Sequence, residues 1–284
     1  RIAVAEAHFD DAAAVLDRAD AILIALLGPD SEHRSRVLEG RALLHDATRD
    51  YPTALAIRRE QLRLLAHRRE QQSLQAAIWF QIGMTHRQLN ELAASRAAYE
   101  RALQLYATAG LPPQAANILG LRRSLANLLM DERRYAEALA AYDAISADLP
   151  ASMARLLQPQ LALSRARALH GLGRYTEAER GFAALLSESE SAEVQAGARQ
   201  GALFAALRRG DAAAAAALYP QIDPAERFEH ALAGSWLALL RGETPAPADT
   251  AILRQELSDP AARPDRVWLR GAPLQELCPD CSAP

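Results

Sequence analysis

Apolar residues recur along this chain at intervals of three and four, the spacing of residues on one face of an α-helix. Two stretches with this pattern have similar sequences: "RRYAEALAAYDAI" starts at Arg133 and "GRYTEAERGFAAL" starts at Gly173. In both, an alanine lies three positions after one aromatic residue and four before the next. Because a small residue between two bulky ones lets a neighbouring helix approach closely, the phrase indicates helix packing rather than a site.

The phrase has six copies, separated by 42, 41, 43, 40 and 37 residues. Its first position is held by Phe9, Tyr51, Leu92, Tyr135, Tyr175 and Ala212. Its small position is held by Ala12, Ala54, Ser95, Ala138, Ala178 and Ala215. Its last position is held by Leu16, Arg58, Tyr99, Tyr142, Phe182 and Tyr219. Only Arg58 breaks the apolar pattern, so the chain is read as an array of similar units.

Another segment with helical periodicity precedes each copy after the first. These segments are 37–47, 74–89, 118–130, 161–169 and 194–207. Asn90, Gly173 and Gly210 lie in the breaks and suit a helix end in the left-handed conformation, whereas Pro150 and Pro159 are expected between units or at helix ends. With no strand-like alternation, the sequence predicts an all-α chain of about five to six helix–turn–helix repeats.

The clearest copy resembles the tetratricopeptide repeat. It reads "WFQIGMTHRQLNELAASRAAYERAL", and the residues on family positions are Trp79, Ile82, Gly83, Leu92, Ser95, Tyr99 and Ala102. A second copy, "SLANLLMDERRYAEALAAYDAISADLP", ends at Pro150. The resemblance implies a right-handed superhelical solenoid of antiparallel helix pairs. The period of about 40 rather than 34 residues is similar to the long repeats of kinesin light chains and MalT-type activators, and HEAT or armadillo repeats are the structural alternative.

The repeats are expected to cover residues 1–242, with the last helix over 224–241. "RIAVAE" is interpreted as the tail of a cut helix whose partner begins at Phe9, which suggests a piece of a larger protein. Residues 243–257 are expected to hold a capping helix, and the Pro-rich residues 258–284 a tail.

Two groups of the tail have candidate roles. Val267, Trp268 and Leu269 are expected to hold the tail against the repeats. Cys278 and Cys281 form a CPDC motif near the chain end, and thiols at this spacing can bind zinc or form a redox disulfide. Since there is no second ligand pair, the preferred interpretation is a tail without chemistry, with a half-site for metal and redox activity as alternatives.

Composition and motifs argue against several classes of function. The net charge is −3 and the 32 basic residues, all arginine, are spread along the chain, which argues against a nucleic-acid binder. The longest apolar run, 21–27, is too short for a membrane span. The histidines show no metal-ligand spacing and there is no phosphate loop or nucleophile motif, so we expect no cofactor, no catalytic residues and a cytoplasmic protein.

The resemblance places a peptide-binding groove on the first helix of each unit. Its contact positions carry over to Phe80, Met84, Arg87, Arg123, Asn127, Gln160, Ser164, Arg167, Gln200 and Phe204. The groove would be apolar around Met84 and Phe204 and basic around Arg123 and Arg167, which favours an acidic or C-terminal peptide. The alternative is that these arginines are ordinary solvated charges.

The sequence thus predicts a non-enzymatic protein-interaction module that belongs to a larger bacterial protein. The alternative is a ligand- or peptide-sensing regulatory domain of a bacterial transcription activator or kinase. Both would use the same helical repeats, since a solenoid can hold a partner or change its curvature when a ligand binds.

Overall fold

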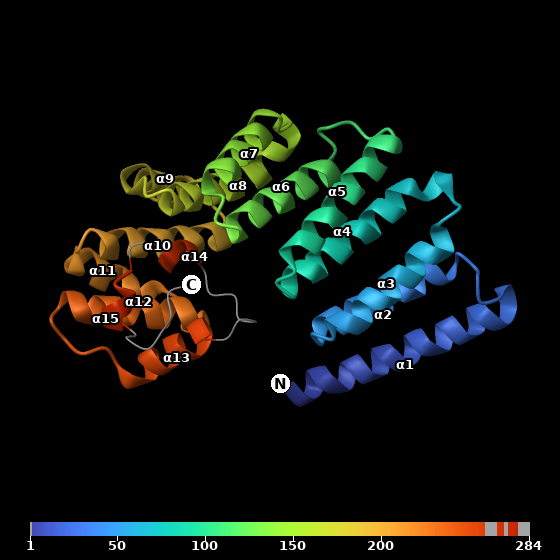
Figure 1. Ribbon diagram of the computed structural model, residues 1–284, viewed down its shortest axis with the longest axis horizontal. Coiled ribbons are helices and arrows are strands. Elements are labelled where there is room, and N and C mark those ends of the chain that lie inside the picture. The colour runs from blue at the N-terminus through green and yellow to red at the C-terminus, as the bar shows by residue number, and fades with distance from the viewer. Residues whose placement is uncertain (1, 259–265, 270–271, 278–284) are drawn as a thin grey trace. The chain divides into compact units, whose positions relative to one another are not determined.

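The computed structural model describes residues 2–258, 266–269 and 272–277 (Figure 1). Every regular element within these residues is a helix, and the helices of the repeats pack mainly on their neighbours in the sequence. The predicted all-α solenoid fold is therefore confirmed. The chain divides into two compact units, Arg1–Leu125 and Ala126–Pro284, which are described separately.

Unit 1 consists of helices joined by short connections. They are α1 (Ile2–Leu27), α2 (Arg34–Ala47), α3 (Tyr51–Leu65), the short η1 (Arg69–Gln71), α4 (Gln72–Gln88), α5 (Leu92–Thr108) and the first part of α6 (Ala116–Asp131). Helix α2 pairs with α3 and helix α4 with α5, as predicted from the spacing of the repeated phrase.

Unit 2 continues the same arrangement and adds short helices after the repeats. It contains the end of α6, then α7 (Tyr135–Ala147), α8 (Ala151–Gly171), α9 (Tyr175–Glu188), α10 (Ala192–Arg208), α11 (Ala212–Leu218), η2 (Tyr219–Gln221), α12 (Arg227–Leu240), α13 (Pro247–Ser258), α14 (Arg266–Leu269) and α15 (Leu274–Leu277). Helices α8 and α9 form a pair, and α10 contacts both of them.

The turns within the pairs have the backbone conformation expected from the sequence. Asn90, Gly173 and Gly210 have φ values of 59°, 79° and 73°, in the left-handed region. After α4, the amide of Glu91 donates to the carbonyl oxygen of His86 at 2.9 Å, which closes the helix end. On the other side of such turns, the Asp211 carboxylate accepts from the Ala214 amide at 2.9 Å and caps α11.

The repeated small residue lies at the closest approach of paired helices. Between α4 and α5, Ser95 is completely buried and its hydroxyl donates to the carbonyl oxygen of Gly83 at 2.7 Å. A Cβ atom on Gly83 would lie 2.5 Å from the ring of Tyr99. The aromatic residue that ends the phrase thus packs directly on the backbone of the partner helix.

Arg58 breaks the repeated pattern because it makes a polar contact where four of the other five copies have an aromatic ring. Its side chain on α3 is 2% exposed. Its guanidinium donates to the Thr85 hydroxyl on α4 at 2.7 Å and pairs with the Asp46 carboxylate on α2. This buried charge is therefore partnered on both sides, and it links three helices of unit 1.

Two details of the predicted elements are wrong. Helix α1 is continuous from Ile2 to Leu27, without a break before Phe9, because no glycine or proline lies in that stretch. Pro159 lies inside α8 rather than at a helix end, since this helix already begins at Ala151. The division into residues 1–242, 243–257 and 258–284 stays a prediction.

The described helices have one further common property. None of them combines the length and the apolar character that a membrane crossing requires.

The contact between Gly83 and Tyr99 is testable by paired glycine substitutions. We expect Gly83→Ala to lower the free energy of unfolding by about 1–2 kcal/mol, because the new methyl group overlaps the tyrosine ring. The control is Gly120→Ala on α6, where a Cβ would meet no heavy atom within 4 Å, and alanine should raise the free energy of unfolding by up to about 1 kcal/mol. Urea denaturation of both variants measures this, and equal effects of the two would contradict the packing.

Candidate functional site

In unit 1 the predicted groove residues lie on α4 and α6. Phe80 and Arg87 are half-buried on α4, and the Phe80 ring lies 5.7 Å from that of Tyr99. Met84, one turn from Phe80, is 41% exposed. Arg123 is half-buried on α6. Of this set, Met84 is the apolar side chain that is most open to a partner.

Helices α2 and α4 of unit 1 have two further large exposed apolar side chains that the sequence analysis did not indicate. They are Leu74 on α4 and Leu43 on α2. Leu43 and Leu74 line a cavity of about 90 Å³ with Ile78, and the side chain of Arg58 also contributes to its wall. Large exposed apolar side chains around a cavity are typical of a surface that binds another molecule.

In unit 2 the structure brings three predicted residues together. Arg167 on α8 donates from Nη2 to Oε1 of Gln200 on α10 at 2.9 Å. Gln200 in turn donates from Nε2 to Oε2 of Glu226 at 2.7 Å. Phe204 follows Gln200 by about one turn of α10 and is buried. These residues form one surface across α8 and α10, which we call the α8–α10 surface.

The other predicted residues of unit 2 make local contacts. The Asn127 side-chain oxygen on α6 accepts from the hydroxyl of Tyr142 on α7 at 2.7 Å. The Ser164 hydroxyl donates to the carbonyl oxygen of Gln160 at 3.0 Å, within α8. Asn127 therefore takes part in helix packing, and Ser164 satisfies a carbonyl of its own helix.

The α8–α10 surface is covered by the chain's own helix α14 (Figure 1). The Trp268 side chain is 0% exposed, and its ring stacks on that of Phe204 with centroids 4.8 Å apart and an interplanar angle of 11°. The His170 ring approaches Trp268 edge-on at 5.1 Å, and the Arg167 guanidinium lies 5.6 Å from its ring centroid. Val267 and Leu269 beside it are also buried, so the predicted anchoring of the tail is confirmed.

The donors Nε1 of Trp268 and Nε of Arg167 are buried at this contact, and neither has a hydrogen-bond acceptor within the described residues. A buried donor without a partner costs about 1–3 kcal/mol. The covering segment therefore fits the surface well in shape but leaves its donors unsatisfied.

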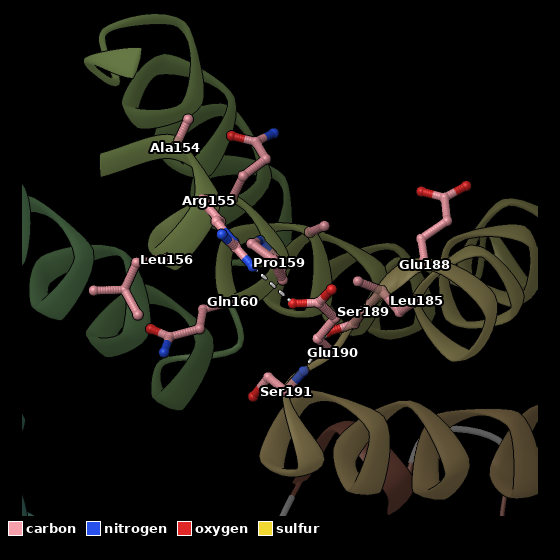
Figure 2. Close-up of a pocket in the computed structure, with 12 residues that line it drawn as sticks. Ala154, Arg155, Leu156, Pro159, Gln160, Leu185, Glu188, Ser189, Glu190 and Ser191 are labelled. Carbon is pink, nitrogen blue, oxygen red and sulfur yellow. Dashed lines mark hydrogen bonds and ion pairs between the residues drawn. The ribbon is translucent and has the colours of Figure 1, made fainter. Parts of the chain in front are cut away.

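A hollow of unit 2 lies between the first half of α8 and the connection from α9 to α10 (Figure 2). Its volume is about 540 Å³, and Pro159, Ala162 and Leu185 contribute apolar walls. Arg155 and Glu190 form an ion pair at 3.0 Å across it, with both side chains largely exposed. Such a pair contributes little to stability, so the hollow can open or accept a charged group. Gln160 also lines it.

A titratable cluster at the end of unit 2 was missed by the sequence analysis. The Tyr219 hydroxyl lies 3.0 Å from Nδ1 of His230. Burial raises the pKa of Asp249, and burial together with the charge of Asp249 raises the pKa of Tyr219. Because these residues come from η2, α12 and α13, only the tertiary structure brings them together.

The metal hypothesis receives no support from the part of the chain that is described, where no three His, Cys, Asp or Glu side chains are grouped to hold an ion. Cys278 and Cys281 lie outside the described residues, so their role stays a prediction.

Comparison with models of protein families gives a match in unit 1. Residues 76–108 match the family model described as the tetratricopeptide repeat. This range covers most of α4 and all of α5, which contain the copy "WFQIGMTHRQLNELAASRAAYERAL". No curated protein matches the chain.

Two predicted groove residues differ in burial, so their substitution should change the free energy of unfolding by different amounts. We expect Phe204→Ala to lower the free energy of unfolding of the chain by about 3–5 kcal/mol, because this substitution removes a buried ring that supports Trp268. Met84→Ala should lower the free energy by about 1 kcal/mol or less, since the residue is 41% exposed. Thermal unfolding followed by circular dichroism measures both, and a similar loss in the two variants would contradict the assignment.

Proposed function

Because the chain is a tetratricopeptide repeat protein, we propose that it is a non-enzymatic interaction module that binds a peptide or partner helix along the first helices of its pairs. Repeats of this family generally mediate contacts between proteins. In this chain the relevant helices are α4 in unit 1 and α8 and α10 in unit 2.

The observation that carries the proposal is the burial of Trp268 on the α8–α10 surface. Trp268 belongs to a short helix outside the repeats, and it contacts Arg167 and Phe204, two residues that the family resemblance assigns to the groove. A surface that accepts a helical segment of the same chain has the shape and chemistry to accept a segment of another protein.

Unit 1 offers an open surface of a similar kind. Leu43, Leu74 and Met84 expose apolar side chains, and Glu39 and Gln81 line the same cavity as the two leucines. Apolar anchors bordered by polar side chains are typical of the grooves that bind amphipathic helices. This surface supports binding of a partner with apolar side chains at helical spacing.

The proposal is tested by peptide selection on the whole chain. Phage-displayed 16-residue peptides are selected on the wild-type protein, then synthesised with a fluorophore and measured by fluorescence anisotropy. We expect Met84→Glu or Leu74→Glu to weaken binding of peptides that occupy unit 1 by at least about tenfold, because a carboxylate replaces an apolar anchor. The matched control is Ala97→Glu on the exposed side of α5. Selection of no binding peptide, or equal weakening by the control, would contradict the proposal.

The hollow of Figure 2 favours a second candidate function, the sensing of a small ligand or short peptide. Its volume of about 540 Å³ lies within the range of small-molecule sites, about 300–1,000 Å³. The side chains of Arg155, Glu188 and Glu190 at the hollow could recognise both ends of an amino acid or short peptide.

A thermal-shift screen with amino acids, dipeptides and tripeptides tests this second function. A ligand present at about 100 times its dissociation constant should stabilise the chain by about 2.7 kcal/mol. Ala162→Phe, which fills the hollow, should abolish the shift, whereas Ala183→Phe on the exposed side of α9 should retain it. A shift that survives Ala162→Phe would place the ligand elsewhere.

A further inference from the structure

We infer that the α8–α10 surface binds a partner peptide with an aromatic residue between aliphatic neighbours and an acidic residue beside them, and that Val267, Trp268 and Leu269 of this chain occupy the surface when the partner is absent. The inference rests on the proposed function. It specifies the chemistry of the partner and how its access is controlled.

The requirement for an aromatic side chain follows from the shape of the surface. Phe204 presents the face of its ring, parallel to Trp268 at 4.8 Å, and His170 presents an edge at 5.1 Å. Phe182 lies at 6.3 Å on another side. Only a flat ring can stack on one aromatic residue while it meets the edge of a second, so an aliphatic side chain would leave part of this space empty.

The aliphatic neighbours are required because burial extends beyond the ring. Val267 and Leu269 are both buried beside Trp268. Helix α14 has only four residues, too few to be stable by itself, so these three side chains hold it in place. Displacement of α14 therefore needs no repeat helix to unfold.

The acidic residue is inferred from Arg167. Its Nη2 atom is taken by Gln200, whereas its Nε atom is buried without an acceptor within the described residues. A carboxylate beside the aromatic residue of a partner could accept from this atom in a charge-assisted hydrogen bond. The chain's own segment has arginines two positions before and two positions after Trp268, Arg266 and Arg270, which carry the same charge as Arg167.

The covering segment is thus an imperfect ligand with the advantage of a covalent connection. A tethered segment competes at an effective concentration in the millimolar range, which weakens the binding of any free peptide. A partner whose carboxylate reaches Nε of Arg167 gains an interaction that is absent among the described residues of the tethered segment. The structure of unit 2 therefore favours a partner that replaces α14 over one that binds beside it.

The experiment uses two fluorescein-labelled peptides on the full-length chain. The first has the sequence of residues 264–277, and the second has glutamate in place of both arginines that flank the tryptophan. Binding is measured by anisotropy on the wild-type chain, on Trp268→Ala and on Trp268→Ala with Arg167→Met. Circular dichroism establishes that each variant is folded.

We expect both peptides to bind Trp268→Ala, and the glutamate peptide to bind about tenfold more tightly, because it supplies the acceptor. Both should bind the wild-type chain at least about tenfold more weakly, because α14 competes. Arg167→Met should bring the affinity ratio of the two peptides close to one. The inference would be overturned by a folded Trp268→Ala chain that binds neither peptide. It would also be overturned if the wild-type chain bound both peptides as tightly as Trp268→Ala does.

A second measurement covers the case in which Trp268→Ala does not fold. A glutamate peptide with phenylalanine in place of tryptophan is added to the wild-type chain and, separately, to Trp268→Phe. Subtracting the emission spectrum of Trp268→Phe from that of the wild-type chain leaves the fluorescence of Trp268. This difference spectrum should shift to longer wavelength when the peptide is added, because Trp268 leaves its buried position. An unchanged difference spectrum at a saturating peptide concentration would contradict displacement.

The source of the segment and the general function are tested separately. If light scattering shows a wild-type dimer that becomes a monomer in Trp268→Ala, α14 occupies a second copy of the chain, and the inferred control within one chain is wrong. Peptides selected on the open surface of unit 1 do not depend on α14. Their binding would support the proposed function even if the α8–α10 surface accepts no partner.

Discussion

Aromatic rings packed directly on glycine fix the distance between neighbouring helices. Tyr99 of α5 lies on Gly83 of its pair partner α4, and Phe182 of α9 lies on Gly201 of the following helix α10, where added Cβ atoms would be 2.5 and 2.3 Å from the rings. No side chain larger than hydrogen fits at these points without a shift of the ring or helix. Since the contact sets the distance between helices, it also sets the position of every residue that the first helix of a pair presents to its other side.

Residues that hold the helices together are therefore different from residues that are available for binding. Residues that repeat, such as Ser95 and Tyr99, are buried within the pairs, and their substitution would act on stability. Residues that do not repeat, such as Met84 and Arg167, vary in exposure and partners from helix to helix. A surface with its own chemistry can therefore arise on each helix without disturbing the fold.

The two units differ in how their first helices are covered. In unit 1 the apolar side chains of Leu74 and Met84 remain exposed on α4. In unit 2 the Trp268 ring of α14 stacks on Phe204 and covers the α8–α10 surface. Burial of this ring stabilises the covered state, whereas the buried Nε of Arg167, which has no acceptor within the described residues, opposes it. The proposed exchange between α14 and a partner follows from this balance.

Local spacing alone determined the helices, their turns and their pairing, because intervals of three and four residues define a helical face and because Asn90, Gly173 and Gly210 adopt positive φ readily. It also identified Trp268 as an anchor, since an apolar cluster in a polar tail favours burial. The sequence could not show what the anchor contacts. Trp268 lies about a hundred residues after Arg167 and over sixty after Phe204, and no periodic pattern connects them. Only the packing of α14 on α8 and α10 decided that two predicted groove residues are covered, because contacts between such distant segments depend on how whole helices are arranged.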